Sequence, residues 1–398
     1  MSMAKCRNER PVVNNLDEFE VDAERGLLPS PDPLECLPPH FNPWEKIAHD
    51  LPKLLVSGQI RSVLERLPLL LPTQLLEGRQ NHRAMLLLSF LGHAYVWGEP
   101  QTVNHIPAGI AIPWYEFSQR LGRPPVLSYS SYALDNWRRL DPSGPIVLGN
   151  IVLLQNFLGG LDEEWFILVH VDIEAKAAPA LAATVQAQKA VNQDQPHEVA
   201  QQLGTIASAI KKMRETLLRM PESCDPYIYY NRVRPYIHGW KDHPVLPEGV
   251  IYEGVHAYGG QPQKFRGESG AQSSIIPCLD AALGITHKED TLRRYLMEMR
   301  EYMPPKHRKF IEAIEKGPSI RQYVLEQPKS CAFLHDSYNA CIHWLERFRS
   351  THLEYAKTYI QKQRQCGTDN PIDVGTGGTP FIPYLKKHRD ETTQHKVL

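Results

Sequence analysis

The chain has 398 residues, 42% of them hydrophobic and 22% charged, and its 44 Lys and Arg residues nearly balance its 45 Asp and Glu residues. This composition is typical of a globular protein and argues against a disordered or fibrous chain. The formal net charge of −1 gives no general electrostatic attraction to nucleic acid or to an anionic membrane. The length favours two domains over one.

The number and spacing of the cysteines and the hydropathy of the chain indicate the cellular compartment. Seven cysteines occur, an odd number, and none forms a Cys-x-x-Cys pair, so a disulfide scaffold and a cysteine zinc site are both poorly supported. Residues 1–19 contain no apolar stretch of the kind found in secretory signals. The most apolar runs, at 67–76 and 166–171, are far shorter than the roughly 20 residues that cross a bilayer. We expect a soluble cytoplasmic protein.

The first half of the chain reads as an arm followed by helices. Residues 1–40 are rich in proline and charge, which predicts an extended arm lying over the surface. Apolar residues then recur at three- and four-residue steps, the spacing of one helical face. Together with the positions of proline, this spacing predicts the following helices: 44–67, 82–97, 113–121, 128–138, 162–190 and 194–220.

The second half begins with a long stretch rich in glycine and proline, at 221–277, which is more typical of a functional segment than of an idle loop. Helical periodicity resumes at 278, and 330–363 is the longest candidate helix, with no Gly or Pro. A Gly/Thr loop follows at 366–381. Alternating strand-like patterns are scarce, so we predict a mainly α fold with a smaller N-terminal and a larger C-terminal domain.

The helix predicted over 330–363 carries a histidine on its apolar stripe. The residues of this stripe are spaced by three or four: Cys341, Leu345, Phe348, His352, Tyr355 and Tyr359. Periodicity alone favours a hydrogen-bonded core histidine at 352. The functional alternative is an axial haem ligand, because a neutral imidazole on a rigid helix in an apolar pocket leaves the other face of the iron free for O₂. Arg349, one turn earlier, is then either a partner of a haem propionate or a solvated surface charge.

Two further patterns can carry chemistry. Phe166 and His170 share one helical face, where a buried histidine and a pocket histidine are equally compatible with the spacing. Arg232 and Arg234 lie among four tyrosines in the segment 227–240, and a guanidinium beside aromatic rings suits an aromatic amino acid, although a structural arginine is as common. The Gly/Ser/Thr loops at 267–274 and 375–379 lack the lysine of a P-loop, so they give little support to nucleotide binding.

Nine segments, taken together and in this order, resemble the indoleamine 2,3-dioxygenases, haem enzymes that open the indole ring of tryptophan. The similarity covers nearly the whole chain. The segments are HAYVWG (93–98), PPVLSYSSYALDNW (124–137), DEEWFILV (162–169), VRPYIHGW (233–240), GAQSS (270–274), LDAALGI (279–285), MREYMPPKHRKF (299–310), FRSTHLEYAKTYI (348–360) and GTGGT (375–379).

The resemblance implies an all-helical two-domain fold with haem b in the larger domain. Residues 1–157 would form the arm and a small helical domain covering the distal pocket, and residues 158–398 the haem-binding catalytic domain with a mobile GTGGT loop. By resemblance, His352 is the proximal ligand of the haem iron and Arg349 lies near a propionate. Ser269 and Gly270 match the loop that lines the haem and the substrate amine.

The resemblance also assigns the residues that hold the substrate. Arg234 matches the arginine that binds the substrate carboxylate, and Phe166 matches the phenylalanine that packs on the indole. Tyr129 matches an aromatic residue on the pocket wall. Thr376, in the C-terminal loop, matches a residue that closes over bound substrate.

The chain departs from the family pattern inside the pocket. His170 stands where many animal and fungal members have Ser, whereas the related tryptophan 2,3-dioxygenases present a His in the equivalent space, so we expect His170 to accept a hydrogen bond from the indole N–H. Tyr229 stands where Phe is usual, and Tyr132 where a smaller Cys occurs. GESG (267–270) replaces a more Gly-rich loop. We therefore expect a tighter and more polar pocket than that of the animal enzymes.

The reaction expected from the resemblance is the addition of both atoms of O₂ across the indole C2–C3 bond of L-tryptophan, giving N-formylkynurenine, the first step of the kynurenine pathway. An electron donor would keep the iron ferrous, and neither nucleic acid nor a membrane is an expected partner. Two alternatives stay open. One is a haem monooxygenase acting on a tryptophan or indole derivative, and the other is a non-catalytic haem or tryptophan sensor.

Overall fold

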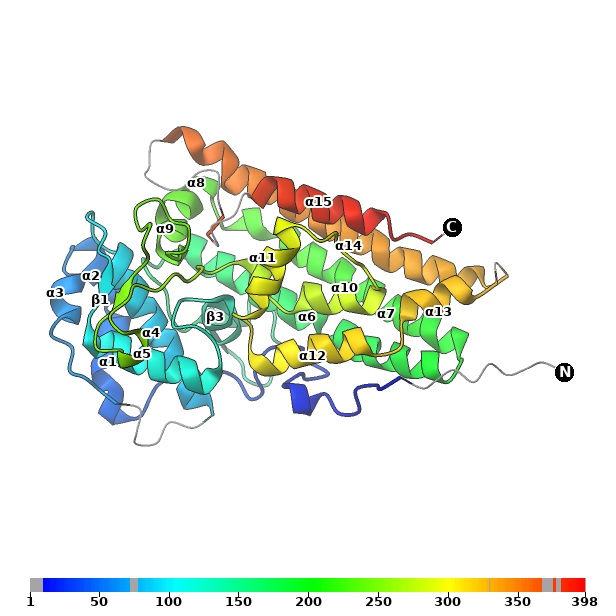
Figure 1. Ribbon diagram of the computed structural model, residues 1–398, viewed down its shortest axis with the longest axis horizontal. Helices are drawn as coiled ribbons and strands as arrows, with labels where there is room; N and C mark the ends of the chain where they lie inside the picture. Colours follow the sequence, from blue (N-terminus) through cyan, green and yellow to red (C-terminus); the bar gives the residue numbers. More distant parts are fainter. Residues whose placement is uncertain (1–9, 72–77, 329, 367–374, 377–380, 398) are drawn as a thin grey trace.

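Figure 1 shows the computed structural model of the protein, which describes residues 10–71, 78–328, 330–366, 375–376 and 381–397. Helices make up most of it, and the strands among the described residues are two or three residues long. The predicted mainly α fold class is confirmed. The elements from α1 to α5 gather at one end of the molecule, and the longest helices run along its long axis (Figure 1).

The helices of the first part of the chain are α1 (Asn42–His49), α2 (Leu51–Val56), α3 (Ile60–Leu64), α4 (Arg79–Trp97), α5 (Ala108–Leu121), α6 (Leu161–Asn192) and α7 (Pro196–Leu218). Those of the second part are α8 (Pro226–Ile228), α9 (Arg234–Ile237), α10 (Ile275–Leu283), α11 (Thr291–Arg300), α12 (Pro305–Lys316), α13 (Ile320–Glu326), α14 (Ala332–Tyr359) and α15 (Phe381–Thr393). Two π-helical segments, η4 (Ser130–Leu134) and η6 (Tyr229–Val233), accompany the short 3-10 helix η8 (Gly270–Gln272). The strands are β1 (His105–Ile106), β2 (Trp137–Arg139), β3 (Ile151–Leu153) and β4 (Ile251–Tyr252).

The long helices α6, α7 and α14 pack along one another and form the scaffold of the site. The buried face of α6 is rich in alanine, and such small side chains allow a neighbouring helix to approach closely. Apolar residues of α7 and α14 meet in the interface between these two helices, where the Cys341 thiol also lies 3.1 Å from the Leu203 carbonyl oxygen. This packing fixes α14, which carries His352. No helix of the described chain is long and apolar enough to cross a membrane.

Several sequence predictions agree with the observed elements. The helices predicted at 82–97, 113–121, 162–190 and 194–220 correspond to α4, α5, α6 and α7, and 330–363 corresponds to α14. The described part of the N-terminal arm is extended between short helical turns, and Phe19 packs on Phe310 of α12 with ring centroids 5.7 Å apart. Glu20 and Lys306 add a salt bridge of 3.1 Å to the same contact.

Two predicted helices are wrong. The segment 44–67 is three short helices, because Pro52 starts a new helix at α2 and Gly58 takes a left-handed φ of +64°. The segment 128–138 forms the π-helical turn η4 and then β2, which pairs antiparallel with β3. The apolar residues of this segment are all buried, so their spacing matches that of a helical face although the segment is not one helix.

The N-terminal elements are joined to the stretch after residue 230. The fully buried His93 of α4 donates from Nδ1 to the Tyr236 carbonyl and accepts at Nε2 from the Leu127 amide. The Trp97 indole donates to the His238 carbonyl, and β1 pairs in parallel with β4. These contacts cross the predicted domain boundary at residue 157, which itself stays a prediction.

Candidate active site

A cavity of about 570 Å³ lies between α6, α10, α11, α14 and α15. Its volume falls within the roughly 300–1,000 Å³ typical of small-molecule and cofactor sites. Residues from η6 and from the loop 268–271 close one end, and Thr376 of the C-terminal loop lines the same end. The cavity therefore draws on segments that are far apart in the sequence.

His352 opens into this cavity from α14. Its neighbours on the stripe, Cys341 and Leu345, are buried against the scaffold, but His352 is accessible from the cavity rather than packed in the core. The imidazole forms no hydrogen bond with another described residue. Desolvation by the cavity walls, and secondarily the charge of His170, lowers the pKa of His352 to about 4. Near neutral pH it is therefore a neutral imidazole with a free lone pair on one ring nitrogen, as a metal ligand requires.

Phe166, His170 and Tyr229 form an aromatic end of the cavity. The ring of Phe166 lies 4.7 Å from that of His170 and 4.6 Å from that of Tyr229, between centroids. His170 Nδ1 lies 2.7 Å from the Phe166 carbonyl oxygen, and because a carbonyl only accepts, Nδ1 carries the proton. Burial lowers the pKa of His170, so its Nε2 is an acceptor.

The loop 267–270 borders the aromatic end. Glu268, Ser269 and Gly270 line the cavity there, and the Thr376 hydroxyl donates to the Glu268 carbonyl. The Ser269 hydroxyl accepts from the Ala271 amide at 3.3 Å, which caps η8. Polar groups thus stand next to an aromatic wall, an arrangement suited to an aromatic molecule with a polar tail.

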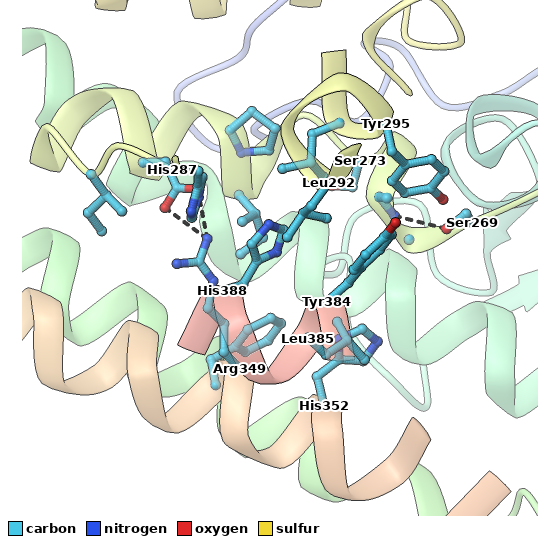
Figure 2. Close-up of a pocket in the computed structure, with 18 of the residues that line it drawn as sticks. Ser269, Ser273, His287, Leu292, Tyr295, Arg349, His352, Tyr384, Leu385 and His388 are labelled. Atoms are coloured by element: carbon cyan, nitrogen blue, oxygen red, sulfur yellow. Dashed lines mark hydrogen bonds and ion pairs between the residues drawn. The ribbon is translucent and has the colours of Figure 1, made fainter. Parts of the chain in front are cut away.

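The opposite end of the cavity is polar and charged. Arg349, one turn before His352, is held by the two oxygens of Asp280 at 2.7 and 2.9 Å and donates to the Thr392 hydroxyl of α15. Figure 2 shows Arg349 and His352 on the same side of α14, with Tyr384, Leu385 and His388 of α15 reaching into the same space. Burial alone would raise the pKa of Asp280, but Arg349 and His287 hold it below its usual value.

A histidine pair completes the polar end. His287 lies 3.2 Å from Asp280 and 2.6 Å from Glu391, and its ring contacts that of His388 in a tilted arrangement with centroids 4.4 Å apart. His388 Nε2 is buried and has no hydrogen-bond partner among the described residues. The sequence analysis missed both histidines. Their only sequence signal is the high count of 17 His, because the spacing does not show which of them meet in space.

Three predicted pocket residues lie near the cavity without lining it. Tyr129 is buried and donates from its hydroxyl to Glu174 at 2.9 Å. Tyr132 stacks on Phe90 with centroids 6.0 Å apart. Arg234 is fully buried at the start of α9, with its guanidinium 5.4 Å from the centre of the Tyr230 ring, and burial lowers its pKa. Contact of these residues with a substrate stays a prediction.

Comparison with known proteins assigns the family. The family model described as indoleamine 2,3-dioxygenase matches residues 15–395. The chain is 37% identical to indoleamine 2,3-dioxygenase 1 of Rattus norvegicus over 390 residues, covering 95% of this chain and 94% of the relative. It is 37% identical to indoleamine 2,3-dioxygenase 2 of Homo sapiens over 394 residues, covering 96% and 95%. It is 30% identical to a 6-hydroxytryptophan 2,3-dioxygenase of Fusarium equiseti, covering 96% and 98%.

The chain therefore belongs to the indoleamine 2,3-dioxygenase family. It is a haem-dependent dioxygenase, an oxidoreductase of the type that acts on tryptophan or a related indoleamine. The name of the Fusarium equiseti relative specifies 6-hydroxytryptophan, so members of the family differ in the indole on which they act.

Proposed function

We propose that the protein binds haem b through His352 and adds both atoms of O₂ to L-tryptophan, giving N-formylkynurenine. The observation that carries this proposal is the neutral, unpartnered imidazole of His352 in a cavity whose far end is aromatic. A porphyrin needs such a ligand and such a cavity, and an indole needs the aromatic end.

The polar end of the cavity fits the acidic edge of a porphyrin. The Arg349 guanidinium lies one turn from His352, and the buried His388 Nε2 lacks a partner among the described residues. Both groups can donate hydrogen bonds to a propionate, and the ring contact with His287 would hold His388 in position. When bound, the haem would supply the activation of O₂, while the protein would provide the His352 imidazole that holds the haem and the polarity of the pocket.

The aromatic end would orient the substrate. Phe166 and Tyr229 pack on the indole ring, and His170 Nε2 accepts the indole N–H, which fixes the rotation of the ring. Holding the ring in one orientation converts an encounter into an effectively unimolecular step. Thr376 and Ser269 hold the amino-acid end and keep water out. We assign the substrate carboxylate to Arg234, a role that requires its guanidinium to move toward the cavity past Tyr229.

Replacement of His352 by Ala tests the ligand assignment. The purified variant, reconstituted with hemin, should show no stable haem absorbance and no activity. His343, on the exposed side of the same helix beside Trp344, gives the matched control, and His343→Ala should keep both. Normal haem binding by His352→Ala would overturn the assignment.

Labelled oxygen tests the reaction itself. With a chemical reductant, ¹⁸O₂ and L-tryptophan, the wild-type protein should give a product carrying two labelled atoms. One labelled atom would indicate a monooxygenase, and binding of L-tryptophan without any product would indicate a sensor. Either result would overturn the proposed reaction.

A further inference from the structure

The backbone of Glu268 is held rigidly at the edge of the cavity. Its amide donates to the Ile237 carbonyl at 3.1 Å, and its carbonyl accepts from the Thr376 hydroxyl. The preceding residue, Gly267, passes so close to Gly239 that an added Cβ would lie 2.1 Å from the Gly239 nitrogen. The position of the Glu268 side chain is therefore set by the fold.

The carboxylate of Glu268 is buried without a cation. The residue is 4% exposed and lines the cavity beside Phe166 and Tyr229. It forms no side-chain hydrogen bond or ion pair with another described residue, and burial raises its pKa to about 8. Arg266, two positions earlier, is engaged by Asp242 at 3.2 Å and Glu298 at 2.9 Å. Near neutral pH this carboxyl group is protonated when no ligand is bound, because an isolated buried charge is costly, and a cationic ligand at this point would favour its ionised form.

Glu174 provides the contrast within the same region. It is also buried, but one of its oxygens accepts from the hydroxyls of Tyr129 and Ser273 at 2.9 and 2.8 Å, and it does not line the cavity. These two hydrogen bonds hold Glu174 in place, although its other oxygen has no hydrogen-bond partner among the described residues. Glu268 has no comparable hydrogen-bond partner for its side chain among the described residues.

We propose that the Glu268 carboxylate binds the ammonium group of the substrate. This inference rests on the proposed function, because it takes the aromatic end of the cavity to hold an indole. An ammonium has three donors, and hydrogen bonds to a carboxylate are charge-assisted. With the ring on Phe166 and Tyr229, the side chain of the indole extends toward the 268–270 loop, where Glu268 meets the cation and Ser269 offers a further oxygen.

Three probe ligands test this inference on the haem-loaded protein. They are L-tryptophan, tryptamine, which keeps the ammonium and lacks the carboxylate, and indole-3-propionate, which lacks the ammonium. Equilibrium dissociation constants come from the change in haem absorbance. Glu268→Gln keeps the shape of the side chain and removes its charge. It should raise the dissociation constants of L-tryptophan and tryptamine by about tenfold or more, and leave that of indole-3-propionate unchanged or lower it. The control Glu301→Gln, on an exposed carboxylate, should change none of the three constants.

The outcomes separate this inference from the proposed function. Equal weakening of all three ligands, or no change in any, would overturn the ammonium site. If Glu268→Gln does not fold, the wild-type dissociation constants test the inference. Indole-3-propionate differs from L-tryptophan only by the missing ammonium, so the inference is overturned if the two bind equally tightly. Product analysis with wild-type protein tests the proposed reaction independently. A protein that binds tryptophan without converting it would still show, in its dissociation constants, whether Glu268 binds the ammonium.

Discussion

His170 illustrates how one hydrogen bond sets the chemistry of a side chain. The Phe166 carbonyl fixes the proton on Nδ1, and burial keeps the ring neutral, so Nε2 has only a lone pair to offer. A residue in this state orients an N–H donor and does not supply a proton. The spacing of Phe166 and His170 on one helical face was enough to predict their proximity, but the tautomer depends on a contact that only the structure shows.

Replacement of His170 by Ser should therefore leave the reaction intact. We expect haem to be retained and the KM for L-tryptophan to rise about three- to tenfold, the effect of one lost neutral hydrogen bond. Steady-state kinetics on the reconstituted enzyme measures this, and His170→Gln, which keeps an acceptor, should recover part of the loss. Complete inactivation of His170→Ser with normal haem content would instead show that the imidazole handles a proton.

At the scale of elements, the sequence predicts those helices whose apolar spacing is produced by a single packing face. The helices α7 and α14 were predicted on this basis, and so was the place of His352 on α14, whereas α4 is buried on all sides from Arg83 to Val96. The helix predictions for 44–67 and 128–138 were wrong. Pro52, Gly58 and a π-helical turn interrupt the helix in these segments, although their apolar residues keep a helical spacing. The polar end of the site was missed because His287 and Glu391 are 104 positions apart and meet only through the docking of α15.

The contact between the 267–270 loop and the residues after α9 gives a prediction at this scale. Gly267→Ala would place a Cβ 2.1 Å from the Gly239 nitrogen and 2.3 Å from the Ile237 carbonyl, so the two segments must separate. We expect a loss of about 1–3 kcal/mol in unfolding free energy, and a larger loss of substrate affinity than of haem affinity. Denaturant unfolding and ligand titration measure the two effects.

Gly204→Ala is the control for this experiment. Gly204 lies in α7 with nothing within 4 Å of an added Cβ, and Ala favours a helix over Gly by about 1 kcal/mol. This variant should be as stable as wild type or more stable. A Gly267→Ala protein that matches it in stability and in ligand binding would show that the loop contact does not position the site.

At the scale of the whole molecule, buried ionisable groups determine how stability depends on pH. Burial raises the pKa of Glu163 and Glu174 to about 7 and that of Glu268 to about 8. In the unfolded chain a carboxyl titrates near 4.5. The folded protein therefore binds more protons than the unfolded chain between these values, and the stability that the protonated groups contribute is lost as pH rises through 7–8.

We expect the melting temperature to fall between pH 6 and pH 9. Buried histidines such as His93 and His307, whose pKa burial lowers to about 4, act in the opposite sense but only below their unfolded value of 6.5. Thermal unfolding at constant ionic strength checks this, and Glu174→Gln should flatten the decline on the alkaline side. A melting temperature that rises toward pH 9 would show that these carboxyls are ionised in the folded state.

The contacts of α4 with the stretch after residue 230 have a consequence for synthesis of the chain. Trp97 and His93 find their carbonyl partners 141 and 143 positions later, and β1 is completed only by β4. As the ribosome extends the polypeptide, the aromatic surface of α4 and α5 stays unpaired until the stretch from Tyr236 to Tyr252 has been synthesised. Contacts between residues so far apart in the sequence slow folding and leave aggregation-prone intermediates exposed. Heterologous production of this protein should therefore benefit from slow translation or added chaperones.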